Sequence, residues 1–280
     1  MNLKKEQMKK NNHKKLLTAG NISIKQCKHG IFAYGRFDKY VGKSFDMYGQ
    51  FSDDEFQILS TFAKDGFVLD IGANIGALTV PFARVAKAVL AFEPQFNVAD
   101  ILTTNVCLNG LDNVDVLRMA VGDKTGTIQM PISDLSVIGN YGGTGLYGVQ
   151  GDTKQLRVQD VQIVAIDDLA LGPIDVVKID VEGHEIQAIK GMERHILASK
   201  PILYVEADRF DKVPALFAYI KSLGYEIMLH KPTLFERNNY YDESENVFGN
   251  IVSINAFCYV PEKHTSVTKE FKVQYKLQPC

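Results

Sequence analysis

From residue 67 onward, short apolar runs alternate with longer segments that carry apolar residues at helical spacing. The runs have the length of β-strands, and the segments between them have the length of helices. Because parallel strands need crossover connections, this alternation predicts an α/β fold with a mostly parallel seven-stranded sheet and helices on both faces. The seven predicted strands are 67–71, 88–92, 114–121, 174–181, 202–205, 225–229 and 251–260.

The remaining segments are arranged around this Rossmann-like domain, which we place at residues 66–262. Residues 1–20 are polar and rich in lysine, and we expect them to form a flexible basic tail. Residues 21–65 are expected to form an N-terminal preamble of antiparallel strands followed by a helix. Residues 263–280 are expected to be a C-terminal extension, and a glycine-rich loop at 133–153 interrupts the domain.

The charge balance and hydropathy exclude several classes of protein. The net charge is -2, so the chain as a whole lacks the positive charge of a nucleic-acid-binding protein, and we expect no nucleic-acid partner. No apolar run approaches the ~18 residues that span a bilayer, and a cytoplasmic location is expected. The lysine-rich tail is expected to be solvated, with weak contact to an anionic membrane surface as the alternative. The sequence leaves the oligomeric state open.

The turn after the first predicted parallel strand has the sequence VLDIGANIG, residues 68–76. Ligands of open α/β sheets bind beyond the carboxyl ends of the strands, which is where this turn lies. Gly72 permits a sharp turn and Gly76 permits close packing of the following helix. A dinucleotide site is one interpretation, but Asn74 replaces its second glycine and the Asp70 carboxylate would repel a diphosphate. Asp70 favours a ligand that carries an ammonium and a sulfonium group.

Glu93 strengthens this interpretation. It ends the second strand in the sequence AFEP, 23 residues beyond Asp70. An acid at about this spacing accepts hydrogen bonds from both hydroxyl groups of an adenosine ribose. By itself Glu93 is equally consistent with an acid at a helix N-terminus before Pro94.

A second dense group of polar residues follows the fourth strand in KIDVEGHE, residues 178–185. Asp180, Glu182, His184 and Glu185 cluster where a buried strand gives way to a helix, at the same sheet edge as Gly72. A single histidine there is more often structural, and a single lysine often pairs with a carboxylate. The group together indicates a functional site.

These motifs resemble the FkbM family of methyltransferases. The resemblance covers VLDIGANIG, AFEP, AVGD at 120–123, IDDL at 166–169 and KIDVEGHE, from roughly Tyr48 to Val260. It implies a class I methyltransferase fold and S-adenosyl-L-methionine as cofactor, with S-adenosyl-L-homocysteine as product. It also implies an acceptor oxygen on a glycan, glycolipid or related natural product.

Methyl transfer to a hydroxyl requires in-line positioning and a base that takes the hydroxyl proton. We expect His184 to be this base, with Glu182 or Glu185 orienting its imidazole, and Lys178 as the next candidate. Asp180 is expected near the methionine amine of the cofactor or near the acceptor hydroxyl. The predicted cofactor-binding residues are Asp70, Gly72, Asn74, Gly76, Glu93, Asp180 and, at the adenine amino group, Asp123.

Three further features lie near the predicted site. Asp180, Glu206 and Asp208 end adjacent strands and have the oxygen ligands that magnesium prefers, although unpaired carboxylates are the expected interpretation and no metal is predicted. The glycine-rich loop is expected either to fold over the acceptor or to be disordered. Aromatic residues of an insert before the last strand are expected to stack on sugar rings or to form a dimer contact. The residues concerned are Asn140, Tyr141, Gly142, Gly143, Gly145 and Tyr147 in the loop, and Phe235, Tyr240 and Tyr241 in the insert.

Three other functions remain as alternatives. A nicotinamide-dependent oxidoreductase shares the fold, but Asp70 and Asn74 disfavour the diphosphate it must bind. A nucleic-acid amino methyltransferase would carry an Asp/Asn-Pro-Pro-aromatic motif after the fourth strand, where this chain has Asp-Val-Glu-Gly. A cofactor-binding protein without catalytic activity would keep the same fold and turn.

Overall fold

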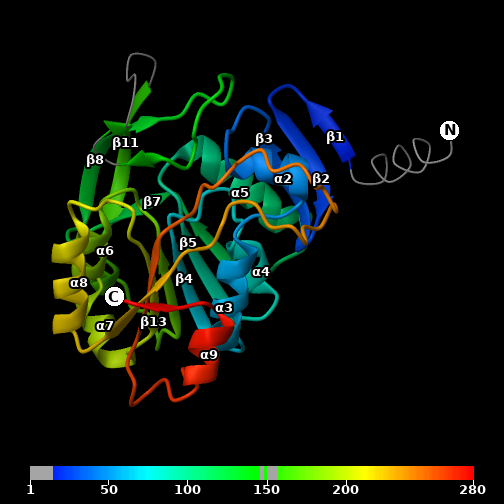
Figure 1. Ribbon diagram of the computed structural model, residues 1–280. Helices are drawn as coiled ribbons and strands as arrows, with labels where there is room; N and C mark the ends of the chain where they lie inside the picture. The colour runs from blue at the N-terminus through cyan, green and yellow to red at the C-terminus, as the bar shows by residue number, and fades with distance from the viewer. Residues whose placement is uncertain (1–14, 146–147, 150–156) are drawn as a thin grey trace.

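The computed structural model describes residues 15–145, 148–149 and 157–280, and it is built on one large twisted sheet (Figure 1). The strand order in this sheet is β16-β14-β15-β13-β12-β4-β5-β6. Its strands are β4 (Phe67–Ile71), β5 (Ala88–Phe92), β6 (Val114–Leu117), β12 (Val176–Ile179), β13 (Ile202–Glu206), β14 (Glu226–His230), β15 (Asn255–Tyr259) and β16 (Gln278–Pro279).

The five strands β6, β5, β4, β12 and β13 lie next to one another in the sheet in this order, and they run parallel to one another. β15 lies antiparallel between β13 and β14, and the two-residue β16 pairs antiparallel with β14 at the edge. The predicted α/β fold with seven strands is confirmed, in a mixed sheet that gains a short eighth strand from the C-terminal extension.

One predicted strand, 114–121, divides in the structure. Its first part is β6, and its second part is β7 (Met119–Val121), which belongs to a separate sheet of order β7-β11-β8. β8 (Gly126–Ile132) and β11 (Arg157–Val164) form the rest of that sheet. Packing explains why the strand divides. Ala120 packs with Met130, Ile132, Val161 and Ile163 in a small apolar cluster that is separate from the core of the large sheet.

Helices cover both faces of the large sheet, because alternate residues of each buried strand point to opposite faces. On one face, Leu69 and Val177 pack against apolar residues of α6 (Glu185–Lys190), α7 (Glu193–Ser199) and α8 (Val213–Ser222). On the other face, Val68 and Val176 pack against α3 (Asp53–Ala63) and α4 (Thr79–Ala83). α5 (Phe96–Leu108) covers the same side nearer to β5. A short 3₁₀ helix, η1 (Ile166–Asp168), precedes β12.

The N-terminal preamble differs from the prediction at two places. β1 (Lys15–Ala19) begins inside the predicted tail, because it pairs antiparallel with β2 (Ile22–Cys27) through a turn at Gly20. β2 pairs with β3 (Gly30–Gly35), but the next segment forms the helix α2 (Val41–Tyr48) rather than a strand. α2 buries Val41 and Phe45 against the strands. The rest of the predicted basic tail lies outside the described residues.

The C-terminal extension completes the fold. α9 (Lys269–Gln274) places Phe271 against the apolar cluster that contains Phe257 of β15. Two short strands, β9 (Thr144–Gly145) and β10 (Gly148–Val149), pair within the glycine-rich loop. Within the described part of the chain, none of the helices is both long enough and apolar enough to cross a membrane.

Candidate active site

A cavity of about 290 Å³ opens at the carboxyl ends of β4, β5, β12 and β13. Its wall also includes the segment that begins α3, the start of the glycine-rich loop and the insert that follows β14. It contains most of the site residues that the sequence predicted: Asp70, Gly72, Asn74, Glu93, Lys178, Asp180 and Glu182.

Gly72 allows the turn after β4 to approach the loop after β12. Its φ is 78°, and a Cβ at this position would lie 1.8 Å from the Asp180 carbonyl oxygen. The Gly72 amide donates a hydrogen bond to the carbonyl oxygen of Phe92, at the end of β5. Only glycine fits this close approach, as the sequence predicted.

Lys178 is a buried cation between two carboxylates. Its Nζ lies 3.7 Å from Asp70 Oδ1 and 3.3 Å from Asp180 Oδ2. Burial alone would lower the pKa of Lys178, but Asp180, Asp70 and Glu55 together raise it above its usual value. The raised pKa favours the charged form of Lys178.

Asp70 is completely buried on β4 and lines the cavity. Its Oδ2 accepts a 2.6 Å hydrogen bond from the Thr79 hydroxyl, whereas its Oδ1 has no hydrogen-bond donor among the described residues. Burial raises the pKa of Asp70, while Lys178 and Thr79 oppose this shift. Oδ1 is ion-paired with Lys178, and a hydrogen-bond-donating ligand would add the hydrogen bond that it lacks.

Glu93 is held at the end of β5 by two backbone amides. Its carboxylate oxygens accept hydrogen bonds of 3.0 Å from the Asn74 amide and 2.9 Å from the Gln95 amide. Asn74 takes a φ of 51°, which turns its amide toward Glu93. Burial raises the pKa of Glu93 to about 7.

Gly76 supports the turn without lining the cavity. Its φ is 86°, and a Cβ there would lie 2.5 Å from Leu102 Cδ1 of α5. It therefore allows close packing of the turn against α5, whereas the sequence predicted close packing of the helix that follows the turn and a contact with the cofactor.

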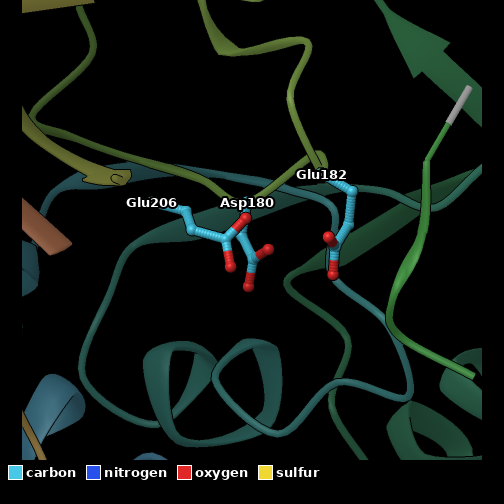
Figure 2. A group of neighbouring side chains, drawn as sticks. All are labelled: Asp180, Glu182 and Glu206. Carbon is cyan, nitrogen blue, oxygen red and sulfur yellow. The ribbon is translucent and has the colours of Figure 1, made fainter. Parts of the chain in front are cut away.

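Asp180, Glu182 and Glu206 form a compact carboxylate group, drawn in Figure 2. One carboxylate oxygen from each lies within 4.8 Å of the others. Glu182 takes a φ of 55° and forms an ion pair with Arg209. The sequence had grouped Asp180 and Glu206 with Asp208 instead. Asp208 lines the same cavity, but Glu182 completes the compact group.

His184 and Asp123 lie away from the cavity wall. His184 is buried at the start of α6, and its Nε2 would lie 3.2 Å from a Cβ at Gly122. Burial lowers the pKa of His184. Glu182 pairs with Arg209 and Glu185 accepts a hydrogen bond from the Gly183 amide. The predicted base, His184, therefore lies apart from Asp180 and Glu182, the two carboxylates of the same sequence motif that line the cavity.

The glycine-rich loop forms part of the cavity wall. Asn140, Gly142 and Gly143 line it. Tyr141 is buried instead, and its hydroxyl donates to the carbonyl oxygens of Leu135 and Val137. Tyr147 lies outside the described residues, and Gly145 belongs to β9.

The aromatic residues of the insert tie it to the N-terminal preamble. Phe235 packs on Tyr48 with ring centroids 5.3 Å apart, and Tyr241 donates a hydrogen bond to the Gln26 carbonyl oxygen. The insert lines the cavity with other residues, namely Pro232, Thr233, Leu234 and Glu236.

Three acids in the cavity wall were missed by the sequence reasoning. Asp54 and Glu55 lie at the start of α3, and Glu236 lies in the insert that follows β14. Burial raises the pKa of Glu55 to about 8 and that of Glu236 to about 7. No spacing relates these residues to the strand ends, so only the tertiary fold places them in the cavity.

A second, smaller cavity is also lined by Gly72 and Pro94. Its other walls are apolar, with Ile71, Phe92, Met119, Val121 and Val181 among them. The two cavities share residues of the turns after β4 and β5. The larger cavity is lined by both acidic and apolar residues, and the smaller one by mostly apolar residues.

Comparison with known proteins agrees with the motifs. Residues 70–227 match the family model described as the methyltransferase FkbM domain. Methyltransferase sdnD of Sordaria araneosa is 24% identical over 216 residues, which cover 65% of this chain and 82% of that protein. Hexuronic acid methyltransferase AglP of Haloferax volcanii is 29% identical over 135 residues, covering 48% of this chain and 53% of that protein.

Solved structures were compared as well. The crystal structure of methyltransferase FkbM from Methylobacillus flagellatus is 20% identical and has a TM-score of 0.46, over 69% of this chain and 43% of that one. A putative methyltransferase from Streptococcus mutans, solved with SAH, is 15% identical with a TM-score of 0.44, over 74% of this chain and 96% of that one.

Proposed function

The chain belongs to the FkbM family of methyltransferases, and from this premise we propose that it transfers a methyl group from S-adenosyl-L-methionine to a hydroxyl oxygen of a sugar, glycan or glycolipid. The methyl donor supplies an electrophilic methyl group on a positively charged sulfur. The residues of this chain must bind that cation, hold the acceptor oxygen in line with it and accept a proton.

The excess of carboxyl groups over amines in the cavity carries the proposal, because a bound cation favours their ionised form and so offsets the pKa increase that burial causes. Coulombic attraction in a partly buried cavity favours a ligand with sulfonium and ammonium groups and disfavours a diphosphate. The same charge argues against the nicotinamide-dependent alternative. Counting only the residues that the structure describes, the cavity wall has one amine, Lys178, and nine carboxyl groups: Asp54, Glu55, Asp70, Glu93, Asp180, Glu182, Glu206, Asp208 and Glu236.

The residues present also fit the rest of the donor. Glu93 is fixed by two amides at the end of β5 and can accept hydrogen bonds from ribose hydroxyls. Asp70 Oδ1 forms an ion pair with Lys178 but accepts no hydrogen bond within the described ranges, so it can still accept one from the ammonium group of the donor. Asp123 is exposed and lines neither cavity, so it is not included in this proposal.

We assign proton removal to Glu55 rather than to His184. Glu55 lines the cavity, whereas His184 does not. A pKa of about 8 places the Glu55 carboxyl near the pH at which general bases work best. Lys178 is a positioning residue that holds Asp180 and the Gly72 turn, and Asp180 faces the acceptor or the methionine amine.

A hydroxyl-rich acceptor is supported by the carboxyl and amide groups in the cavity wall. The relative AglP is by name a hexuronic acid methyltransferase, and it matches about half of this chain. Hydroxyl groups can donate to the carboxylates and accept from Asn140, so a sugar ring suits this wall.

Two measurements test the proposal. S-adenosylhomocysteine is expected to raise the melting temperature of the full chain, and NAD is expected to leave it unchanged. Incubation with methyl-labelled donor and a panel of nucleotide sugars, glycolipids and oligosaccharides should then label at least one oxygen. A shift with NAD alone would overturn the proposal. Binding of S-adenosylhomocysteine without any labelled acceptor would instead support a cofactor-binding protein that lacks catalytic activity.

A further inference from the structure

The carboxylates of Asp180, Glu182 and Glu206 converge from two neighbouring strand ends. Asp180 and Glu182 lie in the turn after β12, and Glu206 is the last residue of β13. Figure 2 shows the Asp180 and Glu206 carboxylates side by side, with the Glu182 carboxylate pointing toward the same space. Three oxygens within 4.8 Å of one another are spaced to share one ion.

Cations of the protein neutralise only part of this group. Lys178 lies near Asp180 Oδ2, and Arg209 pairs with Oε2 of Glu182 and lies near Asp208. Asp180 and Glu182 each keep a second carboxylate oxygen. No salt bridge among the described residues reaches Glu206.

Glu206 provides an observation that is independent of the clustering. Its Oε2 is buried, with less than 1 Å² exposed, and no donor within the described ranges reaches it. Burial, followed by the charges of Asp180, Glu182 and Asp208, raises the pKa of Glu206 well above its usual value. A buried carboxyl oxygen without a partner is costly, and a bound cation would remove that cost.

We propose that Asp180, Glu182 and Glu206 bind one divalent cation of the magnesium or manganese type. Ligands that are all carboxylate oxygens select hard cations over zinc, which prefers nitrogen and sulfur. Three ligands leave other coordination positions open, and these face the cavity because all three residues line it.

The catalytic role that we assign to the cation rests on the proposed function, whereas the binding of the cation to the three carboxylates does not. An acceptor hydroxyl at an open position would become more acidic. Its O–H bond then breaks with the proton going to Glu55, and the oxygen forms a bond to the methyl carbon. The C–S bond breaks with its electron pair remaining on sulfur, which gives the methyl ether and neutral thioether.

Titration of the full chain with Mn²⁺, followed by the electron paramagnetic resonance signal of the free ion, tests the site. The wild type is expected to bind one Mn²⁺, which excess Mg²⁺ displaces. Glu206→Gln should weaken binding by about 10- to 100-fold. The matched control is Glu236→Gln, which neutralises another acid of the same cavity and should leave Mn²⁺ affinity unchanged.

Several results would overturn the inference. One is that the wild type binds no Mn²⁺ at millimolar concentration, and another is that it binds well above one Mn²⁺ per chain. A third is that Glu206→Gln and Glu236→Gln weaken Mn²⁺ binding equally. Circular dichroism confirms that each variant is folded, and the wild-type titration stands even if one is not.

Calorimetry with S-adenosylhomocysteine in EDTA separates this inference from the proposed function. Heat from S-adenosylhomocysteine together with no Mn²⁺ binding rejects the cation site alone. Mn²⁺ binding together with no heat from S-adenosylhomocysteine rejects the proposed function alone.

Discussion

Lys178 Nζ donates a 2.8 Å hydrogen bond to the carbonyl oxygen of Gly72. Lys178 lies on β12, and Gly72 lies in the turn after the neighbouring strand β4, so this bond joins the two sequence motifs of the site. The same amine lies between the carboxylates of Asp70 and Asp180. One buried cation thus fixes both the backbone of the turn and the charges beside it.

Lys178→Met is therefore expected to lower the free energy of unfolding by about 3 to 5 kcal/mol, because it leaves buried carboxylates without their partner. Binding of S-adenosylhomocysteine should weaken as well, since the Gly72 turn loses its anchor. Urea denaturation and calorimetry measure the two effects. Lys221→Met, at an exposed position of α8, is the control and should change stability by less than about 0.5 kcal/mol. Equal effects in the two variants would contradict this account of Lys178.

Gly72→Ala is expected to be far more damaging than Gly110→Ala. Both glycines have a positive φ, 78° and 60°, so both substitutions carry the same kind of backbone strain. A Cβ at Gly110 meets nothing within 4 Å, whereas one at Gly72 overlaps the Asp180 carbonyl oxygen. We expect a loss of about 1 to 2 kcal/mol for Gly110→Ala and of about 3 kcal/mol or more for Gly72→Ala. Thermal and urea denaturation compare them, and similar losses would refute the close approach.

Glu55→Gln and His184→Ala distinguish the two candidate bases. Glu55→Gln should reduce kcat by about 10²- to 10⁴-fold while S-adenosylhomocysteine still binds. In the wild type, kcat should rise with pH through about 8 as the Glu55 carboxyl loses its proton. His184→Ala should retain most of its turnover and lose stability, because His184 is buried. The opposite pattern would restore His184 as the base.

The affinity for S-adenosylhomocysteine is expected to increase as the pH rises through about 7. Burial raises the pKa of Glu93 to about 7, and the ionised carboxylate is the stronger acceptor for ribose hydroxyls. Glu93→Gln should weaken binding by about tenfold or more, because a charged hydrogen bond is lost, and should flatten the pH dependence. Calorimetry across the pH range measures both. A variant with the pH profile of the wild type would exclude Glu93 as the titrating group.

Asp53 is expected to contribute to stability away from the cavity. Its buried carboxylate contacts Lys28 Nζ at 2.6 Å and His29 Nε2 at 2.7 Å, which ties the β2–β3 turn to α3. Burial would raise the pKa of Asp53, but hydrogen bonds from His29, Lys28 and Gln57 outweigh it and lower the pKa to about 2.

Because its folded pKa is depressed, Asp53 stabilises the protein above the unfolded value of 3.8, and this contribution is lost as the pH falls through about 2. Asp53→Asn should lower the free energy of unfolding by about 2 kcal/mol at neutral pH. The difference from the wild type should shrink below about pH 4. Urea denaturation over this range provides the measurement, and a difference that does not change with pH would count against the assignment.

Much of the fold was readable from local patterns. The runs at 67–71 and 88–92 became β4 and β5 with the predicted bounds, because a strand buried on both faces needs a continuous apolar run. The boundary within 114–121 was not readable, since both halves are apolar and only packing assigns them to different sheets. α2 was also missed, because short aromatic runs broken by glycines have no clear period.

The sequence by itself determined the turn and the strand ends of the site. Asp70, Gly72, Glu93, Lys178 and Asp180 are fixed in place by strand register and backbone geometry, which are local properties of the chain. Tertiary structure decided which side chains face the cavity. It turned His184 toward Gly122, and it brought Glu55 and Glu236 into the cavity wall from two segments distant in sequence. The spacing of residues along a chain indicates the direction of the backbone at each of them. Which charged side chains meet depends instead on how elements distant in sequence pack together, and no local pattern specifies that packing.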